Sequence, residues 1–413
     1  MKILLIVPEN SYRIKEFLDA ALTLGLEVYI ATDSTFAPPD LNDRVFDSIE
    51  FCNPESAGNT VNAIVESVGI DTVVAIDEGG IEILEWARAL KNGLVEPPEH
   101  SLALRDKLLL RSVLKDVVPQ PNVFARDFGS IQFGAGIIVK PSKGSASIGV
   151  TRVSTIDELK SAVAFIDTHL KQHGVAIIEE YIEGTEHAFE GVVVNGSLVE
   201  LAIFDKPHPL TGPHFAETIY ITPTSLDEYF RKRVLQCVEA AINALEIENG
   251  PIHVEVRVAN DGTVFIIDFA NRSIGGRCST ALSFIGDRTL EVVLLEAITE
   301  GDASHAHREN QYSGVYMIPT SESGVLQNIK GIEEAREIPF VTDVVIDAKI
   351  GKRYETLPSE GNYMGFIYAK APTRSLCIEA LEKSFNKIVF DIAVDKDHIK
   401  PLSHVDHFSA VER

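Results

Sequence analysis

A segment rich in glycine and serine, Lys140-Pro-Ser-Lys143-Gly144-Ser145-Ala-Ser147-Ile-Gly149, is suited to hold an anion. Five of its ten residues are Gly or Ser, so backbone N–H groups can approach a phosphate closely. Its two glycines have the spacing of a P-loop, but Val150-Thr151 follows where Lys-Ser/Thr would stand, and both flanks resemble strands. We expect a flexible flap that joins two strands and covers phosphates. A solvated surface hairpin is the alternative.

Two carboxylates form the second chemical feature. The strand His253-Val-Glu255-Val-Arg257 alternates polar and apolar residues, so its polar side chains should share one face. A second strand, Val264–Ile267, leads into Asp268, and pairing of the two strands would bring Asp268 beside Glu255. Such carboxylates repel each other unless a cation lies between them, and Mg²⁺ prefers oxygen ligands together with substrate phosphates. The alternative is a solvent-facing strand whose charges alternate by chance.

Further polar groups lie close to these segments in the sequence. Arg272 follows Asp268 and precedes Gly275-Gly276, where it could be a fixed cation for charge developing on a transferring phosphoryl or acyl group. An acidic run from Glu179 to Glu186 follows another apolar strand. Taken singly, each carboxylate of that run is interpreted as solvated.

The elements that must position these groups fall into three blocks. Residues 1–95 alternate apolar runs with helical spacing, which predicts a parallel sheet covered by helices. Their first turn, Pro8-Glu9-Asn10, lacks the glycine-rich fingerprint of a dinucleotide-binding fold. After Pro97-Pro98 we expect a helix over 101–114, and then a mixed α/β middle block. The third block, from about residue 313, is strand-rich, with expected hairpin turns at 350–352 and 360–362 and a final helix over 373–388.

Composition narrows the class of protein. The 413 residues carry 37 Lys and Arg against 61 Asp and Glu, a net charge of −24, which argues against binding to nucleic acid or to a membrane surface. No targeting segment is visible, and the four cysteines have no metal-binding spacing, so we expect reduced thiols in a cytoplasmic protein. His398, His404 and His407 are interpreted as a solvated tail.

In order and spacing, the motifs between Lys107 and Gly276 resemble the ATP-grasp superfamily. Within it they are similar to the carboxylate–amine ligases that make dipeptides from L-amino acids, the L-amino acid ligases. The resemblance covers nearly the whole chain and implies an ATP-grasp fold of the α/β and α+β class. The implied domains are a Rossmann-like pre-ATP-grasp domain at 1–98, a linking helix region at 99–124, an ATP-grasp domain at 125–312 with a flap subdomain at about 125–185, and a C-terminal α+β domain at 313–413.

The resemblance also assigns roles to the positions that match. Those implied to bind ATP lie on the linking helix, the flap and a hinge strand, and they are Lys107, Lys140, Lys143, Gly144, Ser145, Ser147, Glu179, Glu180, Tyr181, Ile182 and Glu186. The implied amino-acid site contains His214, Glu217 and Tyr220, the last where members often carry His. The implied reacting centre contains Arg272, Gly275 and Gly276.

The implied metal ligands are Glu255 and Asp268. Family members usually carry Glu at the second position and often Asn two residues later, where this chain has Asp268 and Ala270.

The activity implied is an ATP-dependent, ADP-forming ligase that joins two amino acids through an acyl phosphate, with Mg²⁺, or Mn²⁺ in its place. Another ATP-grasp carboxylate–amine ligase or carboxylase of small-molecule metabolism is one alternative. A catalytically weak ATP-binding sensor is another, and the departures at Asp268 and Ala270 favour it. A homodimer is the default expectation for such a protein.

Overall fold

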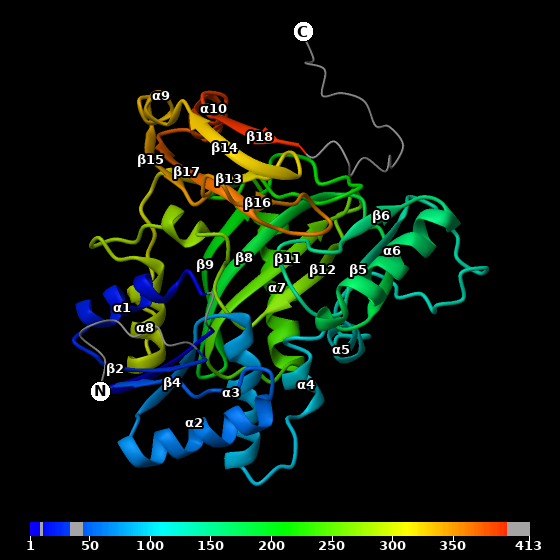
Figure 1. Cartoon of the computed structure of the whole chain (residues 1–413). Coiled ribbons are helices and arrows are strands. Elements are labelled where there is room, and N and C mark those ends of the chain that lie inside the picture. Colours follow the sequence, from blue (N-terminus) through cyan, green and yellow to red (C-terminus); the bar gives the residue numbers. More distant parts are fainter. Residues whose placement is uncertain (9–10, 34–43, 395–413) are drawn as a thin grey trace.

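Figure 1 shows the chain as a computed structural model that describes residues 1–8, 11–33 and 44–394. His398, His404 and His407 lie outside the described residues. The N-terminal elements and the C-terminal elements lie at opposite ends of the view, and a long sheet runs between them. None of the helices in the described ranges is long and apolar enough to cross a membrane.

The N-terminal block is the predicted parallel sheet, with strand order β3-β2-β1-β4. Its elements are β1 (Lys2–Val7), α1 (Ile14–Thr23), β2 (Glu27–Thr32), β3 (Val45–Phe46), α2 (Pro54–Val68), β4 (Thr72–Ala75) and α3 (Glu78–Lys91). Alternate residues of β1 pack against α1 and, on the other face, against α2 and α3, which explains why the strand is apolar throughout. Because α3 begins directly after β4, Glu78 lies at the carboxyl edge of the sheet.

The prediction of one continuous helix over 101–114 is wrong, because two short helices occupy this region. The structure has α4 (Glu99–Leu102) and α5 (Lys107–Val113), with an extended residue, Asp106, between them. The Asp106 carboxylate accepts a hydrogen bond from the Leu108 N–H at 2.9 Å and so caps the second helix. The cap places Lys107 at the start of α5, where its Nζ donates to the Gly144 carbonyl at 2.8 Å.

The flap is a small antiparallel sheet of order β6-β5-β7 with a helix on one face. Its elements are β5 (Ile137–Pro141), β6 (Thr151–Val153), α6 (Ile156–His169) and β7 (Ala176–Glu180). The Gly/Ser segment joins β5 to β6, as predicted.

The long sheet has the order β12-β11-β8-β9-β10-β13-β17-β15. Its strands are β8 (Thr185–Val194), β9 (Ser197–Asp205), β10 (Ile219–Thr222), β11 (Gly250–Val258), β12 (Val264–Ala270), β13 (Tyr312–Pro319), β15 (Val341–Ile346) and β17 (Tyr363–Ala371). The helices α7 (Glu228–Ala244) and α8 (Leu290–Glu300) pack against it. Glu255 is the register partner of Asp268 across β11 and β12, so the predicted pairing is confirmed. Because β10 pairs with both β9 and β13, the sheet continues without a break across residue 312.

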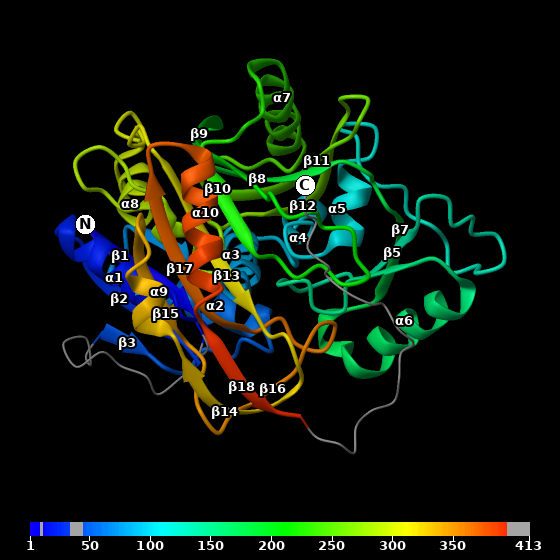
Figure 2. The same ribbon diagram turned by 90° about the horizontal axis from the view of Figure 1, so that it is seen from above.

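The remaining C-terminal strands form a second small sheet of order β16-β14-β18. Its elements and the adjoining helices are β14 (Gly324–Lys330), α9 (Ile332–Arg336), β16 (Arg353–Tyr354), α10 (Arg374–Phe385) and β18 (Val389–Ala393), with α10 packed on β13 and β17 (Figure 2).

The hairpin turns predicted at 350–352 and 360–362 are wrong, because β15 pairs with β17 while β16 pairs with β14. In place of a hairpin, the second turn contacts the flap. The Gly149 N–H donates to the Pro358 carbonyl at 2.9 Å, and a Cβ added to Gly361 would lie 2.4 Å from the Ala146 carbonyl oxygen. Residues 358–361 therefore form a contact between the C-terminal block and the flap instead of a hairpin turn.

Candidate active site

A cavity of about 600 Å³ is bordered by the N-terminal block, the flap, the long sheet and the turn at 361–363. It collects most of the residues predicted for the site. Those that border it are Lys107, Lys140, Gly144, Ser145, Ser147, Glu179, Glu180, Tyr181, Ile182, Glu186, Glu217, Tyr220, Glu255, Asp268, Arg272, Gly275 and Gly276.

Two predicted residues lie outside the cavity lining. Lys143 turns toward the N-terminal block, where its Nζ lies 3.5 Å from the Glu82 carboxylate. His214 is half-buried behind the lining, and its Nδ1 is buried without a hydrogen-bond partner among the described residues. Burial lowers the pKa of His214, which favours a neutral imidazole. Neither side chain borders the cavity.

Buried ion pairs hold the lysines at one end of the cavity. Glu179 lies 2.7 Å from the Lys140 Nζ and 2.8 Å from the Arg111 Nε, and all three residues are buried. Although burial opposes ionisation, the two cations hold the pKa of Glu179 below its usual range. Lys107 lies 3.1 Å from the Asp268 carboxylate. Glu179 therefore positions Lys140 rather than facing the cavity as a free carboxylate.

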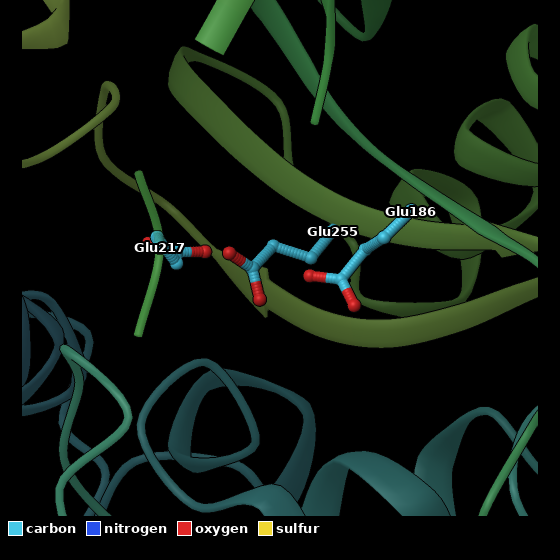
Figure 3. A group of neighbouring side chains, drawn as sticks. All are labelled: Glu186, Glu217 and Glu255. Carbon is cyan, nitrogen blue, oxygen red and sulfur yellow. The ribbon is translucent and has the colours of Figure 1, made fainter. Parts of the chain in front are cut away.

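Lys206 is a site residue that the sequence reasoning missed. Its ammonium contacts the carboxylates of Glu186 (2.7 Å), Glu255 (3.0 Å) and Glu217, which lie side by side in Figure 3. Burial opposes its charge, but these carboxylates raise the pKa of Lys206 well above the ordinary lysine value. A signal was present in the sequence, because an apolar strand ends in Lys-Pro both at Lys140 and at Lys206.

Replacing Lys206 by methionine should destabilise the fold. The change leaves neighbouring carboxylates without their shared cation, and removing one partner of a buried ion pair costs about 3 kcal/mol of unfolding free energy. Thermal unfolding should show a clear fall in melting temperature for Lys206→Met and none for Lys160→Met, since Lys160 is exposed on α6. Equal melting temperatures for the two variants would contradict the role of Lys206.

The carboxylates offer a divalent cation suitable oxygen ligands. Glu255 and Asp268 face the same cavity from paired strands, and their side chains are 21% and 30% exposed. One carboxylate oxygen from each of Glu186, Glu217 and Glu255 also lies within 4.8 Å of the others, but the Lys206 ammonium already contacts all three carboxylates. The pair of Glu255 and Asp268 is therefore the arrangement that fits a hard cation such as Mg²⁺.

Arg272 is fixed by the N-terminal block. Its Nη2 lies 2.6 Å from Glu78 Oε1, while Arg105 lies 2.5 Å from the other oxygen of the same carboxylate. Burial opposes ionisation of Glu78, but the charges of Arg272 and Arg105 outweigh this effect and hold the pKa of Glu78 well below its usual range. Glu78, which orients Arg272, was not among the residues predicted for the site from the sequence.

The hinge strand is locked onto β11 at the opposite end of the cavity. The Arg257 guanidinium donates to the Ile182 carbonyl at 2.8 Å and lies 2.8 Å from the Glu186 carboxylate. The Tyr181 ring lies between two guanidinium groups, with Arg152 at 3.9 Å and Arg257 at 4.8 Å from its centroid. These contacts give the segment from Tyr181 to Glu186 a fixed shape.

Comparison with known proteins defines the class. Residues 133–281 match the ATP-grasp domain family, and the whole chain has the ATP-grasp fold. Residues 316–393 match the family of L-amino acid ligase C-terminal domain 2. The chain therefore contains an ATP-grasp domain and an L-amino acid ligase C-terminal domain 2. The predicted superfamily and fold class are confirmed.

Relatives and solved structures agree with this placement. Alanine–anticapsin ligase from Bacillus subtilis (strain 168) is 26% identical over 271 residues, 58% of this chain and 56% of that protein. The crystal structure of L-amino acid ligase from Bacillus licheniformis superposes with a TM-score of 0.77 at 24% identity, covering 95% of this chain and 99% of that one. N5-carboxyaminoimidazole ribonucleotide synthetase from Thermotoga maritima gives 0.70 at 16% identity, with coverage of 95% and 99%.

These similarities cover only part of the curated relatives, and the identities to the solved structures are low. The chain spans about half the length of the curated relatives that it matches, 56% and 52% for two alanine–anticapsin ligases. At 24% and 16% identity, the solved structures show the fold alone.

Proposed function

We propose that the protein is an ATP-dependent ligase that joins the carboxylate of one amino acid to the amine of another and releases ADP and phosphate. The observation that carries the proposal is a single cavity that places Lys107 and Lys140, the flap loop, the Glu255–Asp268 pair and Arg272 around one space. The match of residues 316–393 to an L-amino acid ligase domain favours amino acids as substrates.

ATP would lie between the flap and the long sheet. Lys107 and Lys140, with the backbone N–H groups of the Gly144–Ser147 loop, would contact its phosphates. The segment from Glu180 to Ile182 would contact the adenine, and Glu186 the ribose. Lys143 would then support the flap through Glu82 rather than contact ATP.

Glu255 and Asp268 would hold Mg²⁺, which when bound neutralises charge on the phosphate oxygens. Lys107 beside Asp268 and Lys206 beside Glu255 would orient the two carboxylates. Tyr220 donates to Glu217 at 2.7 Å, which orients that carboxylate for the α-ammonium group of a substrate.

The reaction would have two steps. The substrate carboxylate attacks the γ-phosphorus of ATP, so that a P–O bond forms to the carboxylate and the bond to ADP breaks. The amine then attacks the acyl carbon, and the tetrahedral adduct expels phosphate. Arg272 would stabilise the oxygens that carry the developing charge, and the closed flap would exclude the water that hydrolyses an acyl phosphate.

Isotope labelling tests this reaction class. A substrate whose carboxylate carries ¹⁸O should transfer one labelled oxygen to inorganic phosphate, and ADP should be the nucleotide product, since the γ-phosphoryl group bonds to that oxygen. Mass spectrometry of phosphate and nucleotides from an amino-acid panel makes the measurement.

Label in AMP would reject the acyl-phosphate route in favour of adenylation. Unlabelled phosphate together with product would reject it too. Phosphate released without any product would indicate the nucleotide-hydrolysing sensor, and product formed from bicarbonate would indicate the carboxylase.

A further inference from the structure

Tyr12 reaches the reacting centre from the N-terminal block. It lies just before α1, and its hydroxyl accepts a hydrogen bond from the Gly276 N–H at 2.6 Å. A Cβ built on Gly275 would lie 3.5 Å from the Tyr12 hydroxyl and 4.0 Å from the Arg272 Nη1. The phenol and the guanidinium therefore both lie close to Gly275.

The ring of Tyr12 is held in this position by its neighbours. The Arg277 guanidinium lies 5.6 Å from the ring centroid. The next residue, Arg13, is buried and donates to the Ser273 carbonyl at 3.2 Å and to the Ser273 hydroxyl. The segment of Tyr12 and Arg13 is thus clamped onto the loop at 272–277. The Tyr12 side chain is nevertheless 41% exposed, because it borders the cavity.

The hydrogen-bonding capacity of the phenol is only half used. Its oxygen accepts from Gly276, which leaves its proton available for donation. Within residues 1–8, 11–33 and 44–394, no acceptor takes that proton. Accepting one hydrogen bond also strengthens the other that a hydroxyl donates. Although Tyr12 borders the cavity, desolvation of its hydroxyl raises the pKa of the phenol, which keeps its proton at neutral pH.

We infer that Tyr12 is a catalytic residue whose hydroxyl donates a hydrogen bond to the anionic oxygen of the reacting acyl group, opposite Arg272. The inference rests on the proposed ligase function and adds to it a residue of the N-terminal block. No proton is transferred: the phenol remains neutral, and its hydrogen bond shortens as charge develops on the tetrahedral oxygen. The site is then complete only when the N-terminal block is docked on the loop at 272–277.

The test is Tyr12→Phe, which keeps the ring against Arg277 and removes only the hydroxyl. Loss of one donor to a tetrahedral oxyanion lowers turnover by about 100-fold. We expect that fall in kcat, with the Kd of Mg-ATP and the melting temperature unchanged. Tyr29→Phe is the matched control, since Tyr29 lies on β2 of the same block and bonds Glu27, away from the cavity lining.

A second readout separates catalysis from structural support. A phosphinate mimic of the tetrahedral adduct should bind Tyr12→Phe about 100-fold more weakly than wild type, while binding of the amino acid itself is unchanged. Unchanged kcat and phosphinate affinity would overturn the inference, as would a fall in melting temperature that accounts for the loss. Failure of the wild-type protein to ligate any amino acid would instead reject the proposed function, and this inference with it.

Discussion

Replacing Arg272 by alanine should abolish ligation while ATP binding survives. Arg272 is buried against Glu78, and Arg105 continues to neutralise that carboxylate after the change, so the fold should persist. A cation that acts mainly on charge developing in the transition state affects turnover more than ground-state binding. The expected loss in kcat/KM is about 10³-fold. The Kd for Mg-ATP should stay within about twofold of the wild-type value.

Lys140→Ala supplies the contrast, because it removes a cation proposed to contact the phosphates. Its Kd for Mg-ATP should rise at least about tenfold, the equivalent of one lost charge-assisted hydrogen bond. Calorimetric titration measures the affinities, and phosphate release measures turnover. Arg336→Ala is a neutral control, since Arg336 pairs with the exposed Glu333 far from the cavity lining. If the Kd for Mg-ATP rose as much in Arg272→Ala as in Lys140→Ala, the roles assigned to the two residues would be wrong.

Glu255→Gln and Asp268→Asn should each lower turnover by about 10³-fold, since a bound metal contributes several kcal/mol of charge stabilisation. Both substitutions keep the size of the side chain, and the strands that carry them pair along their length. The steady-state rate should be measured over a range of Mg²⁺ concentrations, where a weakened site requires more metal for half-maximal rate.

Asp261→Asn serves as the control for these two variants. Asp261 lies in the turn between β11 and β12, where it accepts a hydrogen bond from the Thr263 N–H at 2.9 Å without bordering the cavity. A wild-type rate in Glu255→Gln or Asp268→Asn would remove that residue from the metal site.

Local patterns explain which parts of the site were predictable. The Gly/Ser segment, its flanking strands and the pairing of Glu255 with Asp268 follow from strand alternation and turn composition, which depend on neighbouring residues. The break between α4 and α5 was missed because the apolar spacing continues across Asp106, whose carboxylate instead caps the start of a second helix. The hairpins at 350–352 and 360–362 were predicted wrongly because turn residues do not show which strand will pair with which: β15 pairs with β17 and β16 with β14.

Contacts between distant segments account for the remainder. Arg272 is oriented by Glu78, 194 residues away, and Gly276 by Tyr12, 264 residues away. No periodicity or spacing relates such positions. The direction of Lys143 was equally hidden, because the loop sequence does not show that Glu82 lies beside it. Sequence patterns therefore predicted the residues that border the cavity better than the partners that orient them.

The contact between the flap and the turn at 358–361 affects the departure of products. The long sheet joins the C-terminal strands to the middle block, whereas the flap is a separate small sheet that would have to move for a bound nucleotide to leave. Rotation must break the bond from Gly149 to Pro358 and separate Gly361 from Ala146. We therefore expect this turn to restrain the flap and to slow the exit of a bound nucleotide. In a ligase whose slow step is the escape of ADP, the residues of this remote turn would set the turnover rate without touching either substrate.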